Sequence, residues 1–467
     1  MSNIERSYLA VHGHFSQPPR GNPLTREIGI EEDAAPYENW NARIADRSYR
    51  ANAEAGNFRY ISYSFGESLL AWLEAHQPQI YQTIIASDRD ENSEAATGNA
   101  LATAYHHSIL PLARRRDRRT QILWGIAAFK HRFGRKPNGF WLPEMAVDTD
   151  TLLLLAEAGI AYTVLAAQQI RDLPASGGAG PYKVALPRGH HLAVFVRNDP
   201  LSSEISFKIH TLGGAGYWAR NSLGPARKGS GPLLLLATEG ETFGHHYVGE
   251  DQFLYWLMTH EAPAVGYTIT NLDHYLLQYP PEHTIHIHEP SSWSDQRGLA
   301  NWATGQATAR RDTTWKGALR RALDNAASEI DRAYEDLLRP LAVDPWQLRD
   351  RYAPVLLGAQ AADEFLQAHI PQIDTSTSEK LKTLLSAQEL AQRMYTSYTF
   401  THDALDSRQP RYAIACAAAA LMLARQATGR DLAERLRPDL AVVMSGSVTG
   451  TDILNQVIEE FDLNLAE

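Results

Sequence analysis

The feature that most constrains this chain is an alternation of short β-rich runs with helical patterns through about its first 290 residues. Most of the candidate strands are bounded by Gly, Pro or Asn, and they cover residues 8–14, 60–64, 139–142, 162–165, 192–196, 233–238 and 284–288. Strands separated by helices pair in parallel, so the pattern predicts repeated β-α units around one sheet. Their number favours a sheet that closes into a barrel.

One β-α unit can be followed in full after the run Trp141-Leu142-Pro143-Glu144. Asp148 and Asp150 provide an acidic start, residues 152–158 are mostly apolar, and Gly159 follows as a stop signal. Acidic residues in a first turn and glycine after a last turn are typical of helix boundaries. We therefore expect a helix between these markers.

The hydrophobic pattern changes from about residue 307, where apolar residues recur at three- and four-residue spacing with few β-branched runs. The helical patterns cover residues 310–338, 344–367, 375–395 and 412–427. The sequence thus predicts a (β/α) barrel over residues 1–300, which carries the candidate catalytic groups, and a C-terminal helical domain over 301–467. Cys416, within an alanine-rich run, is interpreted as a buried structural thiol.

Composition excludes several classes of protein. Lys+Arg 44 against Asp+Glu 54 gives a net charge of −10, and residues 114–119 form the one dense basic run. A nucleic-acid partner is therefore not expected. No stretch reaches the roughly 18 apolar residues that span a bilayer, the start lacks a secretory pattern, and one cysteine cannot form an internal disulfide. These observations predict a cytoplasmic protein without a membrane partner; they leave the oligomeric state open.

Histidines gather at or beyond the ends of candidate strands and loops, among them His12, His14, His107 and His246. Such positions converge on one face of a β-α barrel. His12 and His14 lie two apart on an extended strand, so both face the same side and suit either a divalent metal or sugar hydroxyls. Because no further ligand lies at a persuasive spacing, we expect neither a metal nor a cofactor.

Two segments supply carboxylates at strand ends. Glu144 follows Trp141 and Pro143, and either projects from the strand end or caps the next helix. The second segment is a wholly apolar run, 233–237, that ends in Thr238-Glu239-Gly240-Glu241. A buried strand with a polar tip is how a barrel displays catalytic groups.

Carboxylates from separate strands are what glycosidic cleavage requires, since one attacks the anomeric carbon and the other protonates the departing oxygen. Glu144 and Glu239 meet that demand, whereas Glu241 is expected to orient a histidine. Flat aromatic faces near these segments offer surfaces for sugar rings, although most tryptophans are core residues: Trp141, Trp218, Tyr247, Trp256 and Trp293. Trp293, surrounded by hydroxyl residues, is the one we favour as a sugar platform.

Together these segments resemble glycoside hydrolase family 57, whose members act on α-glucans. The resemblance rests on His12-Gly13-His14-Phe15-Ser16-Gln17-Pro18, on Gly98-Asn99 with Tyr105-His106-His107-Ser108, on Gly139-Phe140-Trp141-Leu142-Pro143-Glu144 and on Glu239-Gly240-Glu241-Thr242-Phe243-Gly244. The third of these is the most specific. The resemblance implies an incomplete seven-stranded (β/α) barrel followed by a helical domain, with no required metal.

The resemblance makes Glu144 the catalytic nucleophile and Glu239 the general acid/base, at a position where the family has aspartate. The substrate would be an α-glucan or maltooligosaccharide, positioned by His12, His14, Gln17, His107, Trp141, Glu241, His246 and Trp293. We therefore predict a retaining hydrolase or transferase of the amylase or 4-α-glucanotransferase type. Two alternatives remain: a sugar-binding pseudoenzyme impaired at Glu239, and a metal-dependent deacetylase using His12 and His14.

Overall fold

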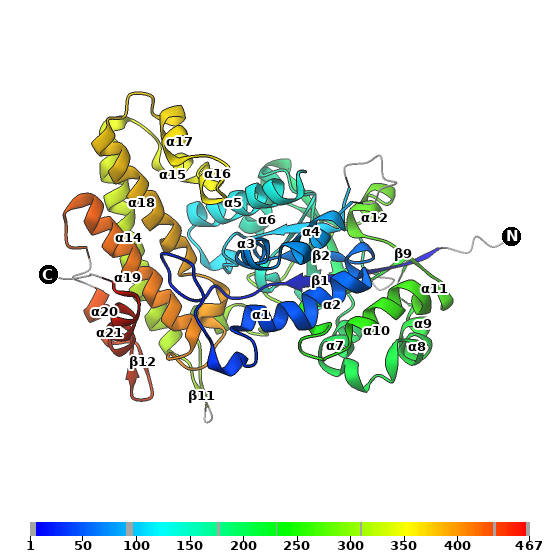
Figure 1. Ribbon diagram of the computed structural model, residues 1–467. Helices are drawn as coiled ribbons and strands as arrows, with labels where there is room; N and C mark the ends of the chain where they lie inside the picture. The colour runs from blue at the N-terminus through cyan, green and yellow to red at the C-terminus, as the bar shows by residue number, and fades with distance from the viewer. Residues whose placement is uncertain are drawn as a thin grey trace. The chain divides into compact units, whose positions relative to one another are not determined.

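The computed structural model describes residues 6–89, 97–174, 178–229, 231–308, 311–432 and 436–463. The chain divides into two compact units (Figure 1). The sheet unit comprises residues 1–17, 30–104 and 132–296, and the helical unit comprises residues 18–29, 105–131 and 297–467. The helical unit thus includes two segments from the first third of the chain, and a division at residue 300 stays a prediction.

The sheet unit is built on a parallel-rich sheet. Its strands are β1 (Ser7–Phe15), β2 (Ser62–Phe65), β3 (Ala100–Thr103), β4 (Gly139–Trp141), β5 (Tyr162–Ala166), β6 (Tyr182–Ala185), β7 (His191–Arg197), β8 (Leu233–Glu239) and β9 (Tyr267–Ile269). In the part of the chain that is described, the seven strands β8-β1-β2-β3-β4-β5-β7 run parallel to their neighbours in that order. β6 pairs antiparallel with β7, and β9 pairs with the start of β1. The predicted α/β class, followed by a helical part, is confirmed.

The row of parallel strands closes only loosely between β7 and β8. Ala179 bridges the seam, since its N–H donates to Leu233 O (3.0 Å) and its carbonyl accepts from Val196 N (2.9 Å). Asn198 N also donates to Leu235 O (2.8 Å). Residues Leu233 to Ala237 of β8 are almost fully buried, as expected for a strand covered on both faces.

The predicted strands omit β3, β6 and β9, and one of them, residues 284–288, is not a regular strand. Residues 284–288 form only isolated bridges, Lys183 with Thr284 and Ile170 with Ile287, because this extended segment meets two different partners in turn. β3 was missed because its four residues, Ala-Leu-Ala-Thr, form a run too short and too poor in β-branched side chains to indicate a strand.

Helices of the sheet unit connect the strands, for example α6 (Thr149–Glu157), which joins β4 to β5 (Figure 1). The others are α1 (Trp40–Ile44), α2 (Ala51–Ala55), α3 (Glu67–His76), α4 (Pro78–Ala86), α7 (Asp199–Lys208), α8 (Gly214–Trp218), α9 (Gly224–Ala226), α10 (Asp251–Trp256), α11 (Ala262–Ala264) and α12 (Leu272–Gln278). The predicted boundaries of α6 are confirmed: Asp148 is its N-cap, and Gly159 follows it at φ 83°.

Replacing Asp148 with alanine is expected to lower the free energy of unfolding by about 1 kcal/mol, because its carboxylate accepts the N–H of Thr151 in the first turn of α6. Urea denaturation followed by circular dichroism measures the loss. Asp148→Asn, which keeps a capping oxygen, should recover most of it; equal losses in both variants would contradict a capping role.

The helical unit is dominated by three long helices that lie side by side, α14 (Trp315–Leu338), α18 (Thr375–Arg393) and α19 (Arg408–Thr428) (Figure 1). The remaining ones are α5 (Arg115–Phe133), whose last two residues belong to the sheet unit, α13 (Ala300–Ala303), α15 (Pro345–Asp350), α16 (Ala353–Leu356), α17 (Ala362–His369), α20 (Leu436–Ala441) and α21 (Gly450–Phe461). The predicted helix over 344–367 is divided into α15, α16 and α17. Cys416 is buried in α19, where burial raises the pKa of its thiol to about 12.

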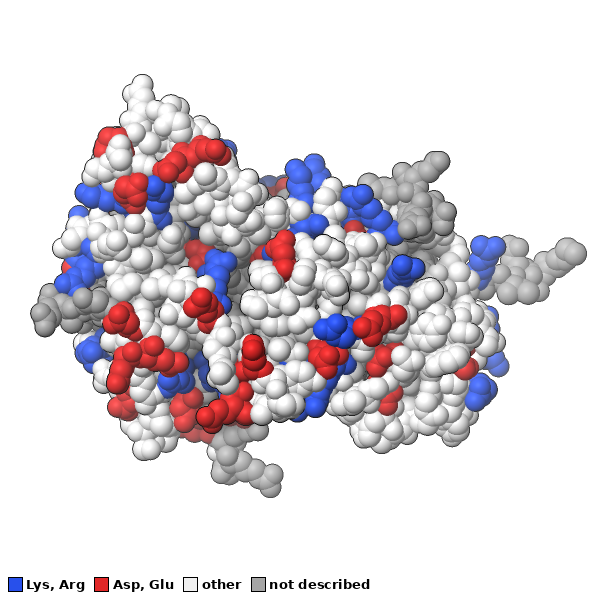
Figure 2. All heavy atoms as spheres, in the orientation of Figure 1, with Lys and Arg blue, Asp and Glu red and all other residues white. Residues whose placement is uncertain are grey.

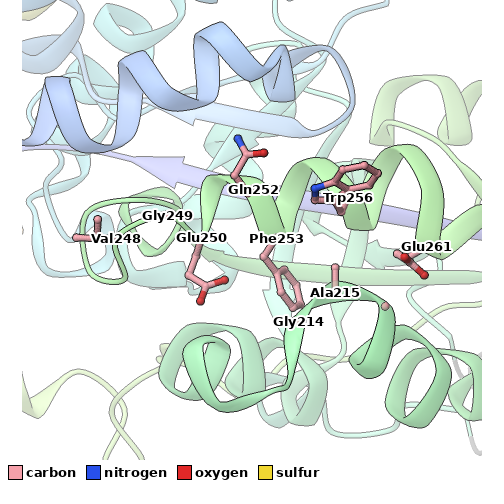
Figure 3. A pocket seen from close by; sticks show the side chains of 10 residues that line it. Gly214, Ala215, Val248, Gly249, Glu250, Gln252, Phe253, Trp256 and Glu261 are labelled. Atoms are coloured by element: carbon pink, nitrogen blue, oxygen red, sulfur yellow. The ribbon is translucent and has the colours of Figure 1, made fainter.

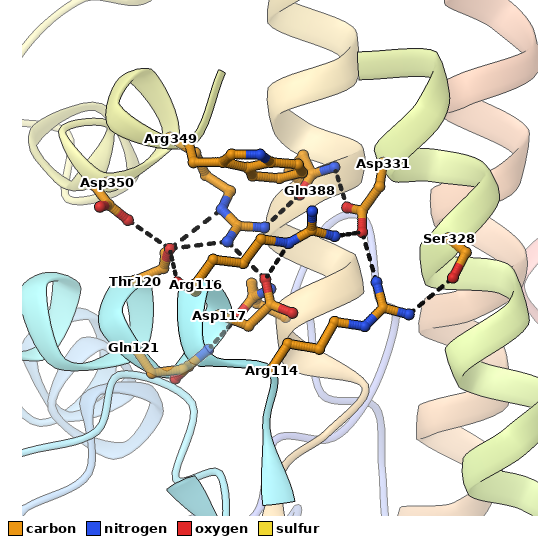
Figure 4. A network of polar contacts seen from close by, with 12 residues as sticks. Arg114, Arg116, Asp117, Thr120, Gln121, Ser328, Asp331, Arg349, Asp350 and Gln388 are labelled. Atoms are coloured by element: carbon orange, nitrogen blue, oxygen red, sulfur yellow. Dashed lines mark hydrogen bonds and ion pairs between the residues drawn. The ribbon is translucent and has the colours of Figure 1, made fainter. Parts of the chain in front are cut away.

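A polar network in the helical unit accounts for the basic run 114–119 (Figure 4). Arg114 and Arg116 both pair with Asp331 of α14. Arg349 is completely buried, yet its guanidinium reaches Asp117 (2.6 Å) and Gln388 (2.8 Å). A buried cation such as that of Arg349 needs such partners, and Asp117 of the run is one of them.

On the face drawn in Figure 2, acidic and basic side chains are interspersed, and the coloured and white atoms show no large area of Lys and Arg alone. Among the described residues, no helix is both long and apolar enough to cross a membrane.

Candidate active site

The carboxyl ends of β1, β4 and β8 carry most of the predicted site residues. In the β1–β8 ladder, His14 lies opposite Glu239 and His12 lies opposite Ala237. Because these strands are parallel, their polar ends meet at one edge of the sheet.

His12 and His14 form a pair that shares one hydroxyl. Ser64 Oγ of β2 lies 3.1 Å from His12 Nε2 and 2.8 Å from His14 Nδ1. Burial lowers the pKa of His12 to about 3, so its ring is neutral, and its Nδ1 is buried without a partner. An orphaned buried N–H costs more than an orphaned acceptor, so we infer that His12 donates from Nε2 to Ser64, which donates to His14.

Trp141 supports both imidazoles. Its ring stacks with His12 at 4.6 Å and with His14 at 5.1 Å between centroids, and its side chain is completely buried. Trp293 meets Trp141 edge-on at 5.6 Å. The two tryptophans therefore join the histidine pair to the end of β4.

Glu144 lies in the short turn Pro143–Met145 just beyond β4, with a left-handed backbone at φ 56°. Trp293 Nε1 (2.9 Å) and Ser294 Oγ (3.5 Å) both donate to its Oε2. Oε1 accepts no hydrogen bond from the residues that the structure describes. Asp148 caps α6, so Glu144 is not used as a helix cap.

The environment of Glu144 raises the pKa of its carboxyl to about 7. Removal from water is the main cause, and the negative charge of Glu239 adds to it, whereas the hydrogen bonds from Trp293 and Ser294 act in the opposite direction. Glu144 and Glu239, on different strands, are therefore close enough for their charges to interact.

Glu239 ends β8, and 59% of its side chain is exposed. Its Oε2 lies 3.4 Å from His246 Nε2, and this contact raises the pKa of His246. Gly240 follows because a Cβ there would come within 2.3 Å of the Phe15 ring. The backbone of Gly240 therefore packs directly against the Phe15 ring, and the short turn Gly240–Thr242 follows β8 immediately after Glu239.

Glu241 and Gln17 are bonded within one buried cluster. Glu241 Oε1 accepts from Tyr49 OH (2.7 Å), Ser16 N (3.0 Å) and Gln17 Nε2 (3.3 Å). Burial raises the pKa of Glu241 to about 7. Its side chain thus holds the segment after β1. Its carbonyl also accepts the N–H groups of His245 (3.1 Å) and His246 (2.9 Å), and its charge raises the pKa of His246, so the expectation that Glu241 orients a histidine stays a prediction.

His107 belongs to the helical unit. Its Nδ1 lies 2.7 Å from Ser397 Oγ, its ring stacks with Tyr398 at 5.0 Å, and burial lowers its pKa to about 3. The sugar contacts expected of His107 remain a prediction.

A metal site would need a third ligand beside His12 and His14. Among the described residues, no group of three or more His, Cys, Asp or Glu side chains is placed to hold a metal ion. The ring nitrogens of the pair that face Ser64 are already engaged with its hydroxyl.

Sequence reasoning missed three residues that support the site. Ser64 and Arg197 directly end or follow candidate strands, and the rule for strand ends applies to both. Arg197 stacks over Trp293 at 4.8 Å and is held by Asp199 at 2.6 Å. Tyr49, which bonds Glu241, lies in a helical stretch with no local signal.

Comparisons with known proteins agree on one family. The model of the family described as "Glycosyl hydrolase family 57" matches residues 5–288, and that of a "Domain of unknown function (DUF3536)" matches residues 312–466. The chain is also 29% identical to "Alpha-amylase 1" of Dictyoglomus thermophilum over 106 residues, which are 22% of this chain and only 15% of that relative.

Two solved structures share the fold. An exo-type maltose-forming amylase from Pyrococcus sp. ST04 aligns with a TM-score of 0.73 and 16% identity, covering 92% of this chain and 82% of that one. A branching enzyme from Thermococcus kodakaraensis aligns with a TM-score of 0.59 and 15% identity, covering 98% and 94%.

Proposed function

Because the chain belongs to glycosyl hydrolase family 57, we propose that it is a retaining enzyme that cleaves or transfers α-glucan chains through a covalent glycosyl-enzyme. Glu144 is the nucleophile, and Glu239 is the general acid/base. The observation that carries this proposal is the pair of carboxyls at the ends of β4 and β8, whose charges interact although the strands lie apart in the row.

In the first step, Glu144 Oε1 attacks the anomeric carbon while the bond to the departing glycosidic oxygen breaks and Glu239 gives its proton to that oxygen. In the second step, Glu239 takes a proton from water or from a sugar hydroxyl, whose oxygen displaces Glu144. Trp293 and Ser294 hold Oε2, which leaves Oε1 available to attack. His246 fixes the orientation of Glu239.

The histidine pair suits a sugar substrate. Ser64 and Trp141 hold His12 and His14 in place, and an uncharged imidazole such as that of His12 exchanges hydrogen bonds with hydroxyl groups. Rigid positioning of this kind brings reacting atoms into range before the bond breaks.

Incubation of the purified protein with maltoheptaose, followed by chromatography of the products over time, tests the proposal. Shorter chains alone would identify a hydrolase, whereas shorter and longer chains together would identify a transferase. The new reducing ends should first appear as α-anomers by proton NMR, because two displacements restore the configuration. Initial β-anomers would contradict a covalent intermediate.

A sugar-binding protein without turnover is the second candidate, favoured by the exposure of Glu239 and by its extra methylene relative to aspartate. It predicts that maltoheptaose binds and is never converted.

The pH dependence of turnover should follow Glu144. The nucleophile must be ionised and its pKa is about 7, so activity is expected to fall as the pH drops below about 7. Trp293→Phe removes a donor that favours the charged form, so the pKa rises and the acidic limb should move up by about one pH unit. Rate measurements between pH 5 and 9 check this shift.

Ser294→Ala removes the longer hydrogen bond to Glu144 Oε2. It should move the acidic limb of the pH–rate profile in the same direction as Trp293→Phe, by a smaller shift in pH. Trp72→Phe, on α3, serves as the matched control, since it makes the same change at a residue that is not among the groups acting on the Glu144 carboxyl. An unshifted limb in Trp293→Phe would contradict the assignment of that limb to Glu144.

A further inference from the structure

A hollow of the sheet unit lies among α8, α10 and the loop that leads from β8 to α10 (Figure 3). Its volume is about 370 Å³, within the roughly 300–1,000 Å³ typical of small-molecule sites. It is lined by Gly214, Ala215, Gly216, Val248, Gly249, Glu250, Gln252, Phe253, Trp256 and Glu261. None of these residues belongs to the candidate active site.

An exposed tryptophan forms one side of this hollow. Trp256 is 47% exposed, whereas Phe253, one turn earlier on α10, is 4% exposed and packs against Trp218. The helix is therefore anchored through Phe253, while the partly exposed ring of Trp256 projects from the same helix among the lining residues labelled in Figure 3. Val248, also in the lining, is 74% exposed, so two large apolar side chains lie at the solvent-facing part of this hollow.

The polar groups of the lining are hydrogen-bond acceptors or amides. Glu250, Gln252 and Glu261 contribute them, and the lining residues include no Lys or Arg. Gly216 admits one carboxylate, because a Cβ there would lie 2.9 Å from Glu261 Oε1. An aromatic face beside carboxylate and amide oxygens suits a neutral, hydroxyl-rich ring and disfavours an anion.

Glycines without side chains form part of the remaining lining. Gly214 and Gly249 have φ values of 83° and 86°, and a Cβ at either would meet nothing within 4 Å. The wall from Val248 to Glu250 also continues the loop that carries His246, the partner of Glu239. A ring can thus approach the backbone closely on a loop that begins at the candidate active site.

We propose that this hollow is a second carbohydrate-binding site, in which Trp256 stacks against a sugar ring of a long α-glucan while Glu250, Gln252 and Glu261 accept hydrogen bonds from its hydroxyls. The identity of the sugar rests on the proposed function. The site holds a distant part of a chain whose cleaved bond lies at Glu144 and Glu239, so it acts on long glucans and not on short ones.

Affinity electrophoresis in gels that contain amylose tests this site, with every variant made in Glu144→Gln protein so that the polymer is not consumed. Trp256→Ala should weaken binding to amylose by about tenfold, and Trp256→Phe, which keeps a flat ring, should retain most of it. Tyr60→Ala is the control, because it removes another exposed aromatic outside the hollow and should change binding by less than about twofold.

Turnover of maltotetraose and of amylose by the protein with Glu144 intact separates the two proposals. Trp256→Ala should slow the amylose reaction and leave that of maltotetraose within about twofold. Binding of amylose that depends on Trp256, with no turnover of any glucan, would uphold the second site and defeat the proposed function. The second site is overturned if amylose in the gel slows the Trp256→Ala variant as much as the Glu144→Gln protein from which it is made. It is also overturned if amylose does not slow the Glu144→Gln protein at all.

Discussion

Replacing Glu144 with glutamine should reduce turnover of maltoheptaose by about 10⁴-fold or more, because the amide cannot form the bond to the anomeric carbon. The side chain keeps nearly the same shape and loses a buried carboxyl whose pKa is already raised to about 7. Folding should therefore be preserved, and binding of maltoheptaose should persist. Initial rates and calorimetric titration measure these two quantities separately.

Azide separates a lost nucleophile from a damaged site. In Glu144→Ala protein, azide can occupy the space of the missing carboxylate and attack from the face opposite the leaving group. It should restore turnover of an activated α-maltoside and give a β-glycosyl azide. An α-azide product would assign the general acid/base to Glu144, and wild-type rates in Glu144→Gln would exclude it from the chemistry.

Replacing Glu239 with glutamine should reduce turnover by about 10²–10⁴-fold for a natural glucan, because the leaving oxygen then departs without a proton. The loss in the first step should be smaller for an aryl maltoside, whose phenolate leaves readily, and azide should then give the α-product. Since the charge of Glu239 helps to raise the pKa of Glu144, the acidic limb should also move to lower pH.

Glu239→Asp separates the function of the acid from its reach. Aspartate keeps the proton donor and shortens the arm by one methylene, as in the family pattern, so turnover should be retained or increased. Unimpaired turnover of natural glucan by Glu239→Gln would contradict the assignment. Binding without turnover in the unmodified protein, followed by strong activity in Glu239→Asp, would support the second candidate function for the natural chain.

Much of the sheet could be predicted from sequence because its strands are apolar runs with clear ends. The run before Glu239 is buried on both faces, and Asp148 and Gly159 mark α6 at both boundaries. β3 escaped prediction because four residues contain too little periodic information. The segment 284–288 was wrongly predicted as a strand because its β-branched residues favour an extended backbone, although this backbone forms only isolated bridges among the described residues.

The residues of the candidate site could be predicted from the sequence, whereas most of the hydrogen bonds between them could not. Glu144 and Glu239 were found because they follow strands. The bonds that hold them come from positions far along the chain, such as Trp293 to Glu144 and Tyr49 to Glu241, and no local pattern encodes such pairings. For the same reason, sequence could not show that the Glu241 carboxylate bonds Gln17.

The register of β1 and β8 fixes where the Glu239 backbone lies. β8 is held by successive pairs with β1 from Tyr8↔Leu233 to His14↔Glu239, so the last residue of the strand is still paired. The exposed Glu239 side chain, and not its strand, therefore supplies the reach of this carboxyl toward a bound chain. A change of one methylene at this position alters that reach without altering the register of the sheet.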